Sequence, residues 1–172
     1  MDEAEVVKLI AQFPPIDKMD DSLIKLKNCR ELSLSSNCIV NMSVALTLRN
    51  LEILSLSRNQ VKRIQGLDEV GATLRELWLS YNQIEKLEGL QSCVKLTNLY
   101  IGHNKIKSLD EIAKLSQLPS LKDLLVANNP FYGDKDKETM KPWIIKRVPD
   151  LKILDGQVVT EAVKERAQEV QD

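Results

Sequence analysis

The residues best suited to nucleophilic or metal chemistry are few and scattered along the chain. His103 is the only histidine, and the spacing of the three cysteines, Cys29, Cys38 and Cys93, fits no zinc or redox motif. A Cys–His or Ser–His pair would have to use His103, yet no acidic residue stands in the expected relation to it. No catalytic or phosphate-binding motif occurs either. We therefore expect no enzymatic activity, no metal and no cofactor, and we interpret His103 as an exposed residue at the end of a strand.

Large apolar residues at outward positions indicate a different chemistry, that of protein binding. Trp78, Tyr100 and Leu125 each stand between two core residues of an expected strand, where the side chain points away from the interior. Ile53 and Tyr81 flank them. The next outward position of each repeat, two residues further along the chain, carries a small residue, which leaves room for a partner. Aromatic anchors inside a polar rim are typical of interface hot spots.

Charged residues are expected to form the rim of this apolar cluster. They are Glu31, Arg58, Glu76, Asp123 and Asp155. The alternative is that the aromatic residues merely stiffen the sheet through cross-strand packing. We favour binding, because the sheet would otherwise be apolar on both faces with only one face covered. The predicted partner-binding residues are Ile53, Arg58, Glu76, Trp78, Tyr81, Tyr100 and Leu125.

A repeated frame positions these residues. Residues 74–90 read LRELWLSYNQIEKLEGL, in which Leu77 and Leu79 alternate as in a strand. The apolar residues after Asn82 recur every third position, as in a 3₁₀ turn. The asparagines of this frame are Asn37, Asn59, Asn82, Asn104 and Asn129, spaced by 22, 23, 22 and 25 residues. Such a period is the signature of leucine-rich repeats, and we expect each buried amide to serve backbone groups of adjacent turns.

The predicted fold is therefore α/β: a right-handed leucine-rich repeat solenoid with a parallel β-sheet on its concave face. Short helices or 3₁₀ turns should lie on the convex face, with one longer helix over residues 109–115. We expect one domain with a helical cap at each end, because a solenoid would otherwise expose an apolar cross-section. Its parts are an N-terminal helical cap and partial repeat (1–28, with an amphipathic helix over 2–12), five repeats (29–130), a C-terminal cap (131–159) and a terminal helix (160–172). The polar run at residues 133–141 is expected to be a solvated loop.

Composition narrows the class of partner. The 172 residues carry a net charge of −1 and are 43% apolar, so no basic excess favours nucleic acid. The apolar runs are too short to span a bilayer. An odd number of cysteines without disulfide clusters favours a reducing compartment, the cytoplasm. We expect the chain to be monomeric on its own, without nucleic acid or membrane partners.

Three stretches give the sequence a more specific resemblance. They are PPIDKMDDSLIKLKNCRELSLSSN (14–37), LSLSRNQVKRIQGLDEVGATLRELWLSYNQIEKLEGL (54–90) and KRVPDLKILDG (146–156). Together they resemble the leucine-rich repeat light chains of axonemal outer-arm dynein, the axonemal dynein light chain 1 family. The resemblance covers about residues 14–157. The PPI-K-M lead-in, the ELW-SYNQI repeat and the closing KR-P-L-LDG make it specific, whereas the repeat frame alone is shared by many proteins.

The resemblance implies a non-catalytic subunit of a ciliary or flagellar motor, located in the cytoplasm, on the cytoskeleton and in the axoneme. It implies binding to the motor region of a dynein heavy chain, at its microtubule-binding stalk tip, and modulation of how the motor engages the microtubule. Trp78 and Tyr100 match the partner-binding sheet face of that family. The terminal helix, with Lys164 and Arg166, would contact the motor or the microtubule, so tubulin is a further partner.

Other classes of adaptor share the same frame and caps. The alternatives are a phosphatase regulatory subunit, although the known one has many more repeats, and an RNA-associated subunit of a spliceosomal particle. The second would be marked by basic charge and salt-dependent RNA binding, which the near-neutral balance disfavours.

Overall fold

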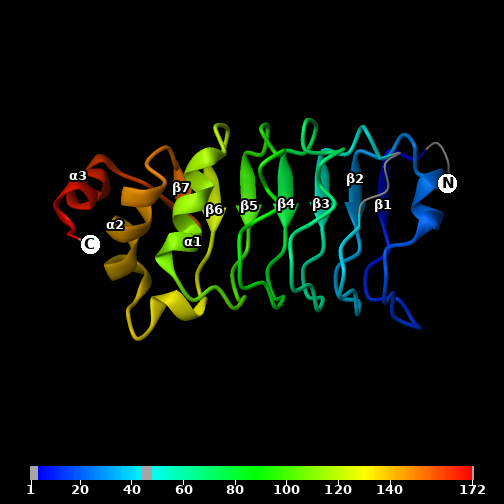
Figure 1. Ribbon diagram of the computed structural model, residues 1–172, viewed down its shortest axis with the longest axis horizontal. Coiled ribbons are helices and arrows are strands. Elements are labelled where there is room, and N and C mark those ends of the chain that lie inside the picture. Colours follow the sequence, from blue (N-terminus) through cyan, green and yellow to red (C-terminus); the bar gives the residue numbers. More distant parts are fainter. Residues whose placement is uncertain (1–3, 44–47, 172) are drawn as a thin grey trace.

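A parallel sheet built one strand at a time runs the length of the molecule (Figure 1). The computed structural model describes residues 4–43 and 48–171. Within them an eight-stranded sheet follows sequence order. Each of the first six strands pairs in parallel with the next, and β7 and β8 pair antiparallel. The strands are β1 (Val6–Lys8), β2 (Glu31–Ser33), β3 (Ile53–Ser55), β4 (Glu76–Trp78), β5 (Asn98–Tyr100), β6 (Asp123–Leu125), β7 (Ile153–Leu154) and β8 (Gln157–Val158). This is the predicted leucine-rich repeat solenoid.

The interior is a stack of aligned leucines. Leu54 and Leu77 pair in register at the centre of neighbouring strands, and Leu99 continues the row. All three are fully buried. Because successive strands carry the same residue type at the same register, each repeat covers the apolar cross-section of its neighbour.

Buried asparagine amides join the repeats, as predicted. Asn82 accepts a hydrogen bond from the Val61 N–H at 2.9 Å and donates to the carbonyl oxygens of Leu56 and Leu79 at 2.9 and 3.0 Å. The bonds made by Asn59 and Asn104 have the same pattern. Each side chain therefore pairs backbone groups at the end of the strand that no ladder bond reaches.

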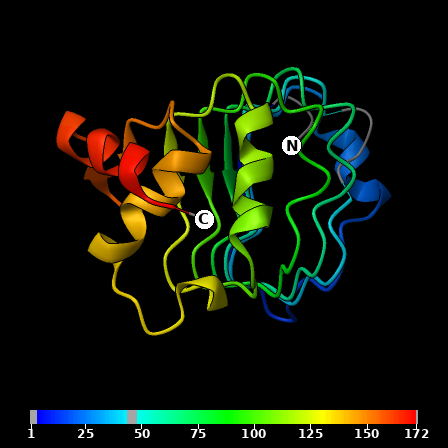
Figure 2. The same cartoon turned by 60° about the vertical axis from the view of Figure 1, so that its left-hand side comes forward.

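The convex returns are tight, and one needs a glycine. Gly89 has a φ of +91°, and a Cβ atom on it would lie 2.1 Å from the Ile64 carbonyl oxygen of the preceding return. The predicted longer helix is present as α1 (Leu109–Ala113), which the 3₁₀ turn η2 (Lys114–Gln117) continues. Figure 2 shows α1 beside the returns of the earlier repeats, on the side away from the sheet.

The N-terminal cap differs from the prediction. Residues 2 and 3 lie outside the described part, and from residue 4 to residue 12 the chain forms no helix. Val6–Lys8 instead pairs as β1 with β2, placing Val7 over Leu32. Val7 is buried while Val6 is exposed, an alternation that fits a strand rather than a helix face. The next segment is helical as expected, with η1 (Asp21–Lys25) burying Leu23.

The C-terminal cap is helical, but its helix begins earlier than predicted. α2 (Lys137–Arg147) takes up part of the polar run assigned to a loop, because Asp136 caps it by accepting the Thr139 N–H at 2.7 Å. A short 3₁₀ turn, η3 (Pro130–Tyr132), precedes it, and α3 (Glu161–Glu169) packs on it at the end of the solenoid (Figure 2). Thr160 takes the predicted N-cap position without a capping side-chain bond. No described helix has the length and apolar character needed to cross a membrane.

Candidate functional site

The sheet aligns the predicted outward residues in one row. Ser55 pairs with Trp78, Trp78 with Tyr100, and Tyr100 with Leu125 in the parallel register. Neighbouring strands lie about 4.8 Å apart, so these three large side chains form one continuous strip on the concave face. The repeat pattern explains why these side chains are aligned. Their aromatic character does not come from the pattern, because the pattern does not specify the residue type at outward positions.

Trp78 and Tyr100 form the centre of the strip. Their ring centroids are 4.3 Å apart with an interplanar angle of 67°, an edge-to-face pair of a kind worth about 1 kcal/mol beyond burial. The Trp78 indole N–H donates to the Glu76 carboxylate at 3.0 Å. Trp78 nevertheless keeps 39% of its surface exposed, so the pair is held in place and still presents apolar surface to solvent.

Tyr100 is oriented through its hydroxyl. This group donates to the Asp123 carboxylate at 2.9 Å and accepts from the Asn98 amide at 3.0 Å. Partial burial, followed by the hydrogen bond to negatively charged Asp123, raises the pKa of Tyr100 above its usual value against the opposing effect of Asn98. The ring therefore stays neutral at physiological pH, with its polar tip turned to the edge of the strip.

A second row lies beside the first, where the strands end. Arg58, Tyr81, His103 and Asn128 occupy equivalent positions, and all have φ between 54° and 61°. The Arg58 guanidinium lies 4.2 Å from the Tyr81 ring centroid, and the His103 ring stacks on Tyr81 at 4.1 Å. Asn128 hydrogen bonds to His103 Nε2 at 2.9 Å. His103 is thus exposed, as expected, but it belongs to a stack that the sequence did not predict.

Between the two rows the concave face is hollowed. The hollow has a volume of about 400 Å³. Five predicted partner-binding residues line it, together with four serines: Arg58, Trp78, Tyr81, Tyr100, Leu125, Ser35, Ser55, Ser57 and Ser80. The small residues thus provide the space beside the large ones that the sequence predicted. Tyr81, at the edge, is 42% exposed.

Two predicted members of the site lie beside the hollow rather than in it. Ile53 is half-buried in β3, with Glu31 and Glu76 as its neighbours in register. Glu76 is half-buried as well and accepts the hydrogen bond of the Trp78 indole. Glu31 pairs with Lys8 at 2.7 Å. The acidic side of the rim is therefore present along the beginnings of these strands.

Asp155 does not belong to the rim, and that prediction was wrong. Its side chain is buried and accepts the backbone N–H groups of Val126 and Ala127 at 2.8 and 2.9 Å. It also accepts the Tyr132 hydroxyl at 2.5 Å. Asp155 follows Leu125 in register, but its carboxylate pairs backbone N–H groups just beyond β6, where the ladder to β7 ends. Burial and this carboxylate raise the pKa of Tyr132 far above its usual value.

Comparison with known proteins decides the family. A model of leucine-rich repeats in two copies matches residues 72–114. The dynein axonemal light chain 1 of Chlamydomonas reinhardtii is 47% identical over 169 residues, which span 96% of this chain and 85% of that protein. The human protein of the same name is 48% identical over 166 residues, 95% of this chain and 86% of that protein. The chain belongs to the axonemal dynein light chain 1 family.

Solved structures of other proteins have the same fold as this light-chain family member. The SNF/U2A' complex of Drosophila melanogaster contains a chain that superposes with a TM-score of 0.73 at 22% identity, covering 90% of this chain and 92% of that one. An internalin C2 from Listeria monocytogenes superposes with a TM-score of 0.61 at 26% identity, covering 77% and 54%. At such low identity the first likeness shows the solenoid alone.

The remaining predicted site residues of this light-chain family member lie apart from the concave face. Lys164 and Arg166 are on α3, at the C-terminal end of the molecule (Figure 1). Lys164 pairs with Glu161 of its own helix at 2.9 Å, and Arg166 is exposed. The structure therefore does not bring these two cations to the aromatic strip, and any contact they make belongs to a second surface.

Two of the three cysteines, Cys29 and Cys93, are buried and show no sign of reactivity. Burial raises the pKa of Cys93 to about 11 and also raises that of Cys29, so both stay protonated at neutral pH. They fill the interior, as the sequence indicated. Among residues 4–43 and 48–171 no group of three or more potential ligands is placed to hold a metal ion.

Proposed function

We propose that this chain is a non-catalytic light chain of outer-arm dynein that binds the motor region of a heavy chain, at its microtubule-binding stalk tip, through the concave face. Binding there modulates how the motor engages the microtubule. Membership of the axonemal dynein light chain 1 family supports the dynein partner. The exposed Trp78–Tyr100 pair beside the 400 Å³ hollow supports the concave face as the contact.

Preorganisation of the face favours tight binding. The Trp78 ring is held by Glu76 and the Tyr100 ring by Asp123, so little side-chain freedom is lost when a partner covers them. Arg58 and Tyr81 close the hollow on its other side. An apolar side chain of the heavy chain would fill the hollow, with polar groups meeting the acidic rim.

The terminal helix α3 would carry the regulatory contact of the light chain. A rigid body fixed on the stalk tip through its concave face would carry α3 along with it. Lys164 and Arg166 would then contact the motor domain or the acidic microtubule surface. The chain would then be located in the axoneme and the cytoplasm, with tubulin as a second contact through these cations.

The test of the concave contact is affinity capture from ciliary extract, followed by calorimetry with a purified stalk-tip fragment of an outer-arm heavy chain. Wild-type protein should capture a dynein heavy chain. Trp78→Ala should weaken the binding of the fragment by about 2 kcal/mol, as removal of a hot-spot anchor does. Phe13→Ala is the matched control, because Phe13 is 99% exposed and lies outside the strip.

Two results would overturn this assignment. One is an unchanged affinity of a Trp78→Ala protein whose folding is intact by circular dichroism. The other is enrichment of a phosphatase or of spliceosomal proteins, with no dynein, by the wild-type chain. The regulatory part is tested separately, by co-sedimentation of the fragment with microtubules. Lys164→Gln/Arg166→Gln should alter the effect of the light chain on that binding while leaving its affinity for the fragment unchanged.

A further inference from the structure

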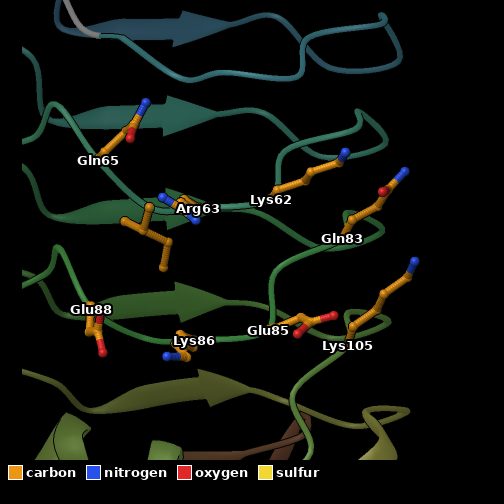
Figure 3. Close-up of a pocket in the computed structure, with 9 residues that line it drawn as sticks. Lys62, Arg63, Gln65, Gln83, Glu85, Lys86, Glu88 and Lys105 are labelled. Carbon is orange, nitrogen blue, oxygen red and sulfur yellow. The ribbon is translucent and has the colours of Figure 1, made fainter.

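The convex side carries a hollow that the proposed function does not use. It has a volume of about 680 Å³ and is lined by the returns of three successive repeats, after Asn59, Asn82 and Asn104. Figure 3 shows Lys62, Gln83 and Lys105 at one edge, on successive returns. Arg63 and Lys86 lie between that edge and the opposite one. Ile64, which is almost fully buried, belongs to the lining.

Cations dominate the lining of this convex groove. Lys62, Arg63, Lys86 and Lys105 form no ion pair with a carboxylate in the described residues, 4–43 and 48–171. The two acids of the groove are already engaged outside it. Their partners are Lys107, 3.5 Å from Glu85, and Lys114, 3.4 Å from Glu88. A chain with a net charge of −1 thus gathers on one face four cations that have no ion-pair partner among its described residues.

We propose that this convex groove binds an acidic peptide segment of a partner protein. The four cations supply charge complementarity for carboxylates, spaced over three repeats as they would be along an extended chain. Gln65 and Gln83 line the groove as well, and their amides can both donate to and accept from a peptide backbone. A polyphosphate offers acceptors only, so it would leave the amide carbonyl oxygens of Gln65 and Gln83 without a donor.

The groove and the concave hollow can be occupied together. They share no lining residue, since the hollow is formed by outward positions of the strands and the groove by the returns behind the sheet. The light chain would then hold one partner through its aromatic strip and a second, acidic one through its back. The two contacts differ in physical character, so they can be separated by mutation and by salt.

Fluorescence anisotropy with a labelled decaglutamate peptide tests the proposal on the full chain at low ionic strength. Wild-type protein should bind the peptide, and affinity should fall as salt is raised towards about 0.15 M. Arg63→Gln/Lys86→Gln should weaken binding about fivefold, as expected for two partly exposed charge contacts. The matched control is Lys27→Gln/Lys95→Gln, which removes two exposed cations elsewhere. It should leave the affinity unchanged.

A further variant makes the result independent of the concave contact. Trp78→Ala should bind decaglutamate as wild type does, even where it fails to capture a heavy chain. Three outcomes would overturn the proposal: no binding of the peptide by wild-type protein at low salt, an equal loss in both double variants, or tighter binding of an oligothymidylate of the same charge. The last would reassign the groove to nucleic acid.

Discussion

The concave sheet face has two halves that share one backbone register and differ in their outward side chains. Over β2 and β3 the row carries Ser33 and Ser55, whose hydroxyls hydrogen bond with Ser35 at 3.2 and 2.7 Å. Over β4, β5 and β6 the same row carries Trp78, Tyr100 and Leu125. The serine half satisfies its polar groups internally and offers little apolar area, whereas the aromatic half leaves ring surface exposed.

This difference separates what builds the solenoid from what it binds. Every repeat contributes the same buried leucines and asparagine, so the frame is equally good under both halves. Burying apolar surface gains roughly 25 cal/mol per Å², and most of such surface lies in the aromatic half, with Ile53 the half-buried apolar residue of the serine half. The outward residues of β4, β5 and β6 can therefore change to suit a partner without disturbing the register of the sheet.

The largest effect is expected from breaking the frame that both halves share. Asn82→Ala removes three buried hydrogen bonds and leaves the Val61 N–H without its acceptor. At about 1 kcal/mol for each bond, the free energy of unfolding should fall by about 3 kcal/mol in urea denaturation. Asn28→Ala, at an exposed asparagine, is the control. A loss for Asn82→Ala no greater than for this control would show that the ladder is dispensable.

The next effect concerns the end that closes the aromatic half. Tyr132→Phe removes the hydroxyl that donates to buried Asp155, and a hydrogen bond to a charged group contributes about 2 kcal/mol. The folded protein raises the pKa of Tyr132 above the ordinary value of 10.0. It therefore binds this proton more tightly than the unfolded chain does.

Stability from Tyr132 is accordingly complete below pH 10 and is lost as pH rises above it. Chemical denaturation at several alkaline pH values should give a steeper fall for wild type than for Tyr132→Phe. Parallel pH profiles of the two proteins would contradict this account of the Asp155 contact.

Much of the concave face was predictable, because a repeat period is a local signal that also fixes which residues become neighbours. The row from Ser33 to Leu125 and the buried asparagines followed from counting. The family resemblance was likewise carried by short stretches such as residues 54–90. The repeat period does not predict which hydrogen bonds orient the side chains of the row. The hydrogen bonds that Trp78 donates to Glu76 and Tyr100 donates to Asp123 depend on side-chain rotamers.

The errors arose where the period stops. β1 is a three-residue edge strand that forms by pairing with β2. Its own sequence shows no strand pattern, so the spacing of its apolar residues predicted a helix. Asp155 continued the outward row by count, yet Tyr132, 23 residues before it, draws it inside. Arg58, Tyr81 and His103 stand at equivalent positions with a left-handed backbone, and the residue types alone do not predict that their side chains stack.

A direct exchange between the halves gives the next effect. Tyr100→Ser places in the aromatic row the residue that occupies it in the serine half. It removes the partner of the Trp78 ring and the donor to Asp123, so binding to the heavy-chain stalk-tip fragment should weaken by about 1–2 kcal/mol. Ser55→Ala, made in the serine half, should change the affinity little. Equal losses in calorimetry would mean that the two halves do not differ in binding.

The smallest effect locates the boundary between the halves. Arg58 follows β3, a strand of the serine half, yet its guanidinium stacks on Tyr81 of the aromatic half. Exposed cation–π contacts contribute about 0.5–1 kcal/mol, so Arg58→Gln should weaken fragment binding by about 0.5 kcal/mol. Lys62→Gln, at a convex cation of the same repeat, controls for net charge. If Arg58→Gln weakens binding no more than Lys62→Gln does, the stack lies outside the contact and the boundary falls between β3 and β4. A loss specific to Arg58 extends the site by one repeat, because the side chain that completes the Tyr81 stack comes from the serine half.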